Sequence, residues 1–213
     1  MRDDNITPKF DTCFFERYAK ETLVTLLGEQ YCDLVNRDRP DLQDPIRGLG
    51  IEVTRAMHES KAEAISLLNE MAADEIVEQP DMTNRELYKI GYTYGLMRQD
   101  VVGPTEYRYW CEASTINRVL ENKVRKVIDG FYGNFEHQGL YIFSKDDTQY
   151  EDILMAMRRV NQLQAHATNG FEMLYISEIQ NLFVCNMKSM TVEKYPISEE
   201  MCRIFFHRAA RGE

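Results

Sequence analysis

Apolar and polar positions alternate along the chain with two periods, which separate helical from extended segments. Residues 13–29 carry apolar side chains three or four positions apart, which is typical of a helix with one buried face. The same spacing predicts further helices over 59–78, 83–99, 116–129, 148–166 and 198–210. Two-residue alternation or continuous apolar runs predict strands within 31–43, 50–56, 139–144, 171–179 and 182–187, the last two forming a hairpin.

The order of these elements indicates an α/β fold, because helices and strands are interspersed rather than segregated. A mixed β-sheet flanked by helices is the expected architecture. A chain of 213 residues is the size of one domain, so we expect residues 1–213 to form a single unit. Within it, about 80–112 has the character of a helical and loop insertion, rich in aromatic residues.

Composition and charge exclude several classes of protein. The net charge of −10 argues against non-specific coating of nucleic acid or an anionic membrane, although a local basic groove remains compatible with it. No apolar run is long enough to span a membrane, and the N-terminus lacks the pattern of a secretory signal. The five cysteines form no CxxC pair, which is typical of reduced thiols. We therefore expect a cytoplasmic protein with no membrane partner.

Candidate chemistry centres on two carboxylates, since the chain has no dinucleotide, P-loop, zinc-protease or hydrolase-elbow motif. Asp41 follows Pro40, and Glu52 alternates with Ile51 and Val53 on the next predicted strand. If the two segments lie side by side, both carboxylates can share one hard cation such as Mg²⁺ or Mn²⁺. The alternative is that Pro40-Asp41 is only a turn and Glu52 only a strand-edge residue.

The segments RPDLQD and GLGIEVTRA resemble the core of the PD-(D/E)XK nuclease superfamily. The sequence resembles a divergent member of that superfamily. The resemblance implies a restriction-endonuclease-like fold and metal-dependent hydrolysis of phosphodiester bonds in nucleic acid, with DNA favoured over RNA. Asp41 matches the family's PD aspartate and Glu52 its acidic (D/E) position. The position of the family's catalytic lysine is Thr54, which can orient a water but supplies no positive charge.

Two further residues complete the expected site. The family has a helical glutamate before the PD motif. On the 13–29 helix Glu16 and Glu29 flank the apolar arc, whereas Glu21 lies opposite it and should be solvated. We favour Glu16 as a metal ligand, with Glu29 second. When the 116–129 helix is followed to residue 131, Lys123 falls within the apolar arc that also includes Phe131. It either extends its ammonium to solvent or meets the carboxylates as a relocated catalytic lysine.

The expected partner is nucleic acid bound through a local basic groove, and a homodimer is compatible with the family. Candidate groove residues are Arg55, Lys61, Arg125, Lys126, Arg158 and Arg159. Rings that could stack on bases are Tyr88, Tyr92, Tyr94, Tyr107, Tyr109 and Trp110. The alternative function is a catalytically inactive nuclease-fold module that binds nucleic acid or protein.

Overall fold

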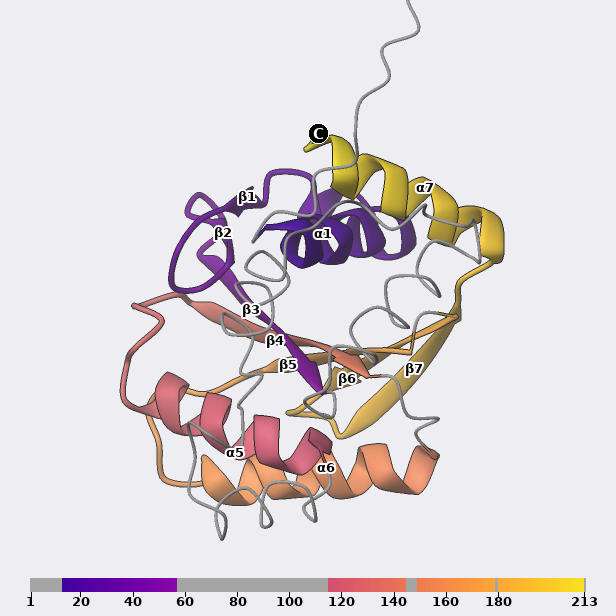
Figure 1. The fold of residues 1–213 in the computed structure, drawn as a ribbon. Helices are drawn as coiled ribbons and strands as arrows, with labels where there is room; N and C mark the ends of the chain where they lie inside the picture. The colour runs from indigo at the N-terminus through magenta and orange to yellow at the C-terminus, as the bar shows by residue number, and fades with distance from the viewer. Residues whose placement is uncertain (1–12, 57–114, 145–148, 179, 213) are drawn as a thin grey trace, which may run out of the picture.

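The computed structural model describes residues 13–56, 115–144, 149–178 and 180–212. In this part of the chain, a seven-stranded sheet lies between two pairs of α-helices (Figure 1). One face is covered by α1 (Phe14–Leu27) and α7 (Glu199–Arg211). The other face is covered by α5 (Thr115–Ile128) and α6 (Tyr150–Leu163). The expected α/β architecture with a mixed sheet between helices is confirmed.

The strands follow one another across the sheet in their order along the chain. The two central pairings, β3 with β4 and β4 with β5, are parallel, and the remaining four pairings are antiparallel. The strands are β1 (Val35–Asn36), β2 (Leu42–Asp44), β3 (Leu49–Ala56), β4 (His137–Ser144), β5 (Met173–Ser177), β6 (Asn181–Asn186) and β7 (Thr191–Pro196).

Alternation along the central strands divides the interior into two cores. On β3, Ile51 and Val53 pack toward α1 and α7, and on β4 Leu140 and Ile142 pack toward α5 and α6. Burial on both faces explains why the central strands have few exposed positions. The even-numbered residues of β3, among them Glu52 and Thr54, consequently project toward the layer of α5 and α6.

Three differences from the sequence prediction have local causes. The edge strand β7 was not expected, because its sequence TVEKYP is largely exposed and lacks an apolar face. The segment after α1 is a short 3₁₀ turn, η1 (Glu29–Tyr31), before the two-residue β1. Helix α5 ends at Ile128, so Phe131 does not belong to its apolar face and is 43% exposed.

The packing of α7 on α1 corrects the expected environment of Glu21. Its side chain is 13% exposed rather than solvated, and it accepts a hydrogen bond from Arg208 at 2.9 Å. Arg17 from α1 donates to the backbone carbonyl of Ala209, also in α7. The helix period alone could not indicate that a second helix covers this side of α1.

The predicted helices over 59–78 and 83–99, the insertion at about 80–112, its ring cluster and Lys61 lie outside the described residues. Among the helices that the structure describes, none combines the length and apolar character needed to cross a membrane.

Candidate functional site

The site is built where β2 separates from β3. Leu42 pairs with Ile51 in the antiparallel register, and continuing that register by one position would set Asp41 opposite Glu52. The backbone pairing of β2 with β3 ends at Leu42, and Asp41 bonds to β3 through its side chain instead. The backbone N–H of Val53 donates to Asp41 Oδ2 at 2.8 Å, which fixes the carboxylate against β3.

The loop that carries Asp41 is held by its neighbours. The N–H of Arg37 donates to the carbonyl of Asp41 at 2.9 Å, and Gln43 Nε2 donates to the carbonyl of Pro40 at 2.9 Å. Gly50 permits the close approach of this loop to β3. A Cβ at Gly50 would lie 2.8 Å from Pro40 Cγ and 2.8 Å from Phe135 Cγ, closer than real Cβ atoms pack.

Glu52 receives the side chain of Lys123 from α5. Lys123 Nζ lies 2.6 Å from Glu52 Oε1, and the two side chains are 19% and 9% exposed. The neighbours of Lys123 on the helix face, Leu120 and Val124, are buried in the core below the sheet. The stem of the lysine therefore runs along the apolar core while its ammonium pairs with the carboxylate. Lys123 thus meets the Glu52 carboxylate instead of extending to solvent, and its part as a relocated catalytic lysine stays a prediction.

The environment of Asp41 changes its acidity. Burial raises the pKa of Asp41, the negative charges of Glu52 and Glu16 raise it further, and the pKa reaches about 8 despite the Val53 N–H and Lys123. Burial and the charge of Glu52 also raise the pKa of the Tyr132 hydroxyl. The raised pKa favours a protonated Asp41 at neutral pH, beside the pair of Glu52 and Lys123.

Glu16 and Glu29 have different environments. Glu16 is 6% exposed, and its charge acts on Asp41, whereas Glu29 is exposed at the start of η1. Among the described residues, no group of three or more histidine, cysteine or acidic side chains is arranged to hold a metal ion. The structure brings Asp41 and Glu52 together with Lys123. Glu16 as a third metal ligand stays a prediction.

Thr54 lies two positions beyond Glu52 on the same face of β3 and is 4% exposed. The residue is therefore buried between β3 and the layer of α5 and α6. The positive charge that this position lacks is supplied at Glu52 by Lys123 instead.

The predicted groove residues are scattered. Arg55 does not contribute a surface charge: it is 4% exposed, and its guanidinium lies 4.2 Å from the centre of the Phe15 ring. It is buried because odd positions of β3 face α1. Arg159 pairs with Glu121 at 2.6 Å on the outer surface of the helices. Lys126 does lie near the carboxylates, since the charges of Glu52 and Asp41 act on its pKa.

Two residues beside this site were not expected from the sequence. Arg39 precedes Pro40, and its guanidinium lies 4.7 Å from the centre of the Phe131 ring; Lys126 Nζ lies 5.0 Å from the same centre. The position of Arg39 next to the PD pair was a usable signal. No signal in the sequence indicated that Phe131 lies on the surface, because helical spacing assigned the ring to the core.

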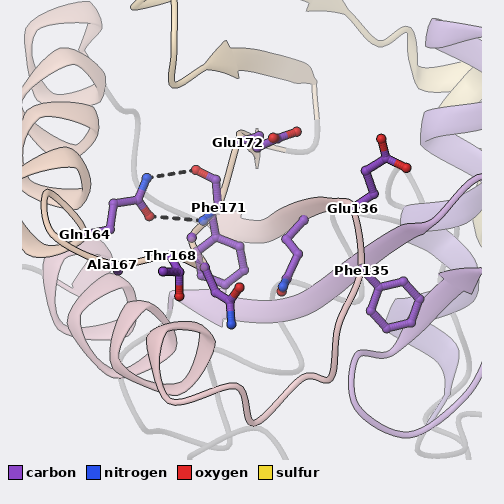
Figure 2. A pocket seen from close by; sticks show the side chains of 10 residues that line it. Phe135, Glu136, Gln164, Ala167, Thr168, Phe171 and Glu172 are labelled. Carbon is purple, nitrogen blue, oxygen red and sulfur yellow. Dashed lines mark hydrogen bonds between the residues drawn. The ribbon is translucent and has the colours of Figure 1, made fainter.

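A pocket of about 240 Å³ opens at the N-terminal ends of β4 and β5 (Figure 2). Gln164 closes one wall by two hydrogen bonds to the backbone of Phe171, each 3.0 Å long. Glu136 and Glu172 project at its rim, and Glu172 also pairs with His137 at 2.9 Å. These acidic side chains disfavour a phosphate, so the pocket is a poor place for a nucleic-acid backbone.

Comparison of the chain with protein-family models, with curated proteins and with solved structures gave no match. The resemblance to the PD-(D/E)XK nucleases therefore rests on the residues and the geometry described above.

Proposed function

We propose that the chain is a nuclease of restriction-endonuclease-like fold that hydrolyses phosphodiester bonds in DNA with Mg²⁺ or Mn²⁺ as cofactor. The observation that carries the proposal is the meeting of Asp41, Glu52 and Lys123, which come from three separate segments of the chain. Two carboxylates beside an ammonium form a charge pattern suited to metal-assisted attack on a phosphodiester. The resemblance of RPDLQD and GLGIEVTRA to the superfamily supports the same activity.

The donor set suits a magnesium-like cation. Such ions are commonly held by one or two protein carboxylates together with substrate phosphates and water, so Asp41 and Glu52 can suffice. Burial and, after it, the negative charge of Glu52 raise the pKa of Asp41, and the positive charge of a bound cation would offset both effects. When bound, the ion would polarise the scissile phosphate and lower the pKa of the attacking water.

The chain's own residues have distinct parts in the proposed reaction. The Val53 N–H fixes the orientation of Asp41, and Glu52 fixes that of Lys123. The ammonium of Lys123 stabilises negative charge that develops on the phosphate, a role that Thr54 cannot fill. Glu52 thus both provides an oxygen ligand and positions the catalytic cation.

Cleavage of fluorescently labelled duplex and single-stranded DNA in the presence of Mn²⁺ or Mg²⁺ tests the proposal. Asp41→Asn and Glu52→Gln should each lower the cleavage rate by about 100-fold or more, because each removes charge but keeps shape. Asp44→Asn, at the opposite end of β2, is the matched control and should retain cleavage if it remains folded. Cleavage by Asp41→Asn at the wild-type rate would overturn the assignment.

The inactive-module alternative has one observation in its favour, the replacement of the motif lysine by Thr54. Calorimetric titration with Mn²⁺ separates the two functions. Binding that Asp41→Asn abolishes, accompanied by DNA cleavage, supports the nuclease. A chain that neither binds Mn²⁺ at these carboxylates nor cleaves DNA is the module instead.

A further inference from the structure

An exposed aromatic ring with two cations lies beside the carboxylate site. Phe131, in the turn after α5, is 43% exposed. The guanidinium of Arg39 and the ammonium of Lys126 lie 4.7 Å and 5.0 Å from the centre of its ring. The three side chains come from the loop before β2, the last turn of α5 and the turn that follows it. We refer to Arg39, Lys126 and Phe131 as the cation–ring cluster.

The cluster borders the carboxylates closely enough for their charges to interact. Burial lowers the pKa of Lys126, and the positive charges of Lys123 and Arg39 lower it further, whereas Glu52 and Asp41 oppose that change. Arg39 is only two residues from Asp41 along the chain. A DNA strand whose phosphate lies at Asp41 and Glu52 can therefore reach the cation–ring cluster.

Three neighbouring cations are unusual in a chain with 25 basic and 35 acidic residues. Lys123 is compensated by Glu52, and Arg39 has an exposed partner in Asp38 at 3.5 Å. Lys126 forms no ion pair with any residue in the described part of the chain. Because like charges held together repel, an anionic ligand beside Lys126 would relieve this repulsion.

We propose that the cation–ring cluster binds an unpaired stretch of a DNA strand next to the phosphodiester that is cleaved. Lys126 pairs with a backbone phosphate, and one base extends the stack of the Phe131 ring and the Arg39 guanidinium. In a duplex the faces of the bases are covered by their neighbours, so only an unpaired base can offer its face to this stack. The inference rests on the proposed nuclease function for its choice of ligand.

Binding measured without metal tests this inference independently of cleavage. Fluorescence anisotropy in EDTA compares a short single-stranded DNA with a duplex of the same sequence. Phe131→Leu and Lys126→Gln are the test variants. Tyr150→Leu, an exposed ring on α6, and Lys188→Gln, an exposed cation between β6 and β7, are their matched controls. Thermal unfolding verifies that all four variants remain folded.

We expect the wild-type chain to bind the single strand more tightly than the duplex. Phe131→Leu should weaken single-strand binding about tenfold and duplex binding little, because one stacked base is lost. Lys126→Gln should weaken binding to both and lower the slope of log affinity against log salt by about one. The two control variants should bind as the wild type does.

Equal affinity for the two DNA forms, equal losses in Phe131→Leu and Tyr150→Leu, or no binding at all would overturn the inference. Single-strand binding that depends on Phe131, without any Mn²⁺-dependent cleavage, would instead contradict the nuclease function and leave this inference standing. If Phe131→Leu cleaves duplex DNA as the wild type does and the chain shows no preference for single strands, the nuclease function stands and this inference is wrong.

Discussion

Lys123 Nζ lies 2.6 Å from Glu52 Oε1, although 71 positions of the sequence separate the two residues. The contact joins a helix to a central strand and gives the carboxylate pair a cation that the motif itself lacks. Both side chains are largely withdrawn from solvent, at 19% and 9% exposure, so the pair differs in kind from the surface ion pairs of the same chain.

A double-mutant cycle should detect this difference. Lys123→Met alone should lower the free energy of unfolding by about 2 kcal/mol at neutral pH, because it leaves the Glu52 carboxylate buried without its partner. Glu52→Gln in the same chain should recover part of that loss, with a coupling energy of about 1–3 kcal/mol. Urea denaturation of the four proteins gives both quantities.

Arg159 and Glu121 provide the matched control for that cycle. Their atoms are also 2.6 Å apart, but the side chains are 46% and 37% exposed. Their coupling should be below about 1 kcal/mol. Equal coupling in the two pairs would contradict the buried character assigned to Lys123 and Glu52.

The raised pKa of Asp41 predicts an unusual pH dependence of stability. The folded carboxyl titrates at about 8 and the unfolded one near its ordinary value of 3.8, so the folded state holds more protons between these values. In EDTA, stability should therefore fall as pH rises from about 4 to 8, by at most ~1.4 kcal/mol per pH unit. Asp41→Asn should flatten this dependence and raise stability at pH 8 and above. Urea denaturation at several pH values measures it.

Asp44 provides a control of opposite sign at the other end of β2. Hydrogen bonds from Arg47 lower the pKa of its carboxyl, so its contribution to stability is present at neutral pH and is lost as pH falls through the folded pKa. Asp44→Asn should destabilise the chain at neutral pH. If Asp41→Asn also destabilises it at pH 8, Asp41 is ionised and compensated in the metal-free fold.

Periodicity predicted the parts of the fold and site that depend on local burial. Alternation on β3 correctly separated Glu52 and Thr54 from Ile51 and Val53, and helical spacing put Lys123 on an inward face. These inferences held because each residue's direction follows from its own element.

Positions that depend on a second element were beyond this reasoning. Glu21 is covered by α7, and Arg55 faces inward and lies against Phe15 because β3 is buried on both faces. Phe131 continues the helical spacing of α5 after the helix has ended, so the pattern assigned to the core a ring that lies on the surface. None of these environments is encoded in the residue's immediate neighbours.

Replacing Glu16 should change the titration of Asp41 and, if Glu16 is a ligand, also the affinity for Mn²⁺. Its buried carboxylate raises the pKa of Asp41, so Glu16→Gln should lower the pH at which Asp41 titrates in the metal-free chain. If Glu16 is also a ligand, the variant should bind Mn²⁺ about tenfold more weakly by calorimetry. Glu29→Gln, at an exposed position, should change neither quantity. Wild-type Mn²⁺ affinity in Glu16→Gln would exclude Glu16 as a ligand.

Gly50 predicts that backbone spacing, and not only side-chain chemistry, sets the geometry of the site. In Gly50→Ala the new Cβ would lie 2.8 Å from both Pro40 Cγ and Phe135 Cγ, so the loop that carries Asp41 must move away from β3. We expect a loss of about 1–3 kcal/mol in stability, as for other overpacked sites. The shift should also weaken the bond from Val53 to Asp41 and hence Mn²⁺ binding and DNA cleavage.

Gly28→Ala separates this displacement from general destabilisation. Gly28 has φ of +97° but no atom within 4 Å of an added Cβ, so that variant should lose stability through backbone strain alone. Calorimetry and cleavage assays below the unfolding transition should find wild-type Mn²⁺ affinity and cleavage in Gly28→Ala and losses of both in Gly50→Ala. If the two variants lose stability equally and both retain cleavage, the contact between Pro40 and β3 does not position Asp41. A loss of Mn²⁺ binding and cleavage confined to Gly50→Ala would show that the close packing at Gly50 positions Asp41.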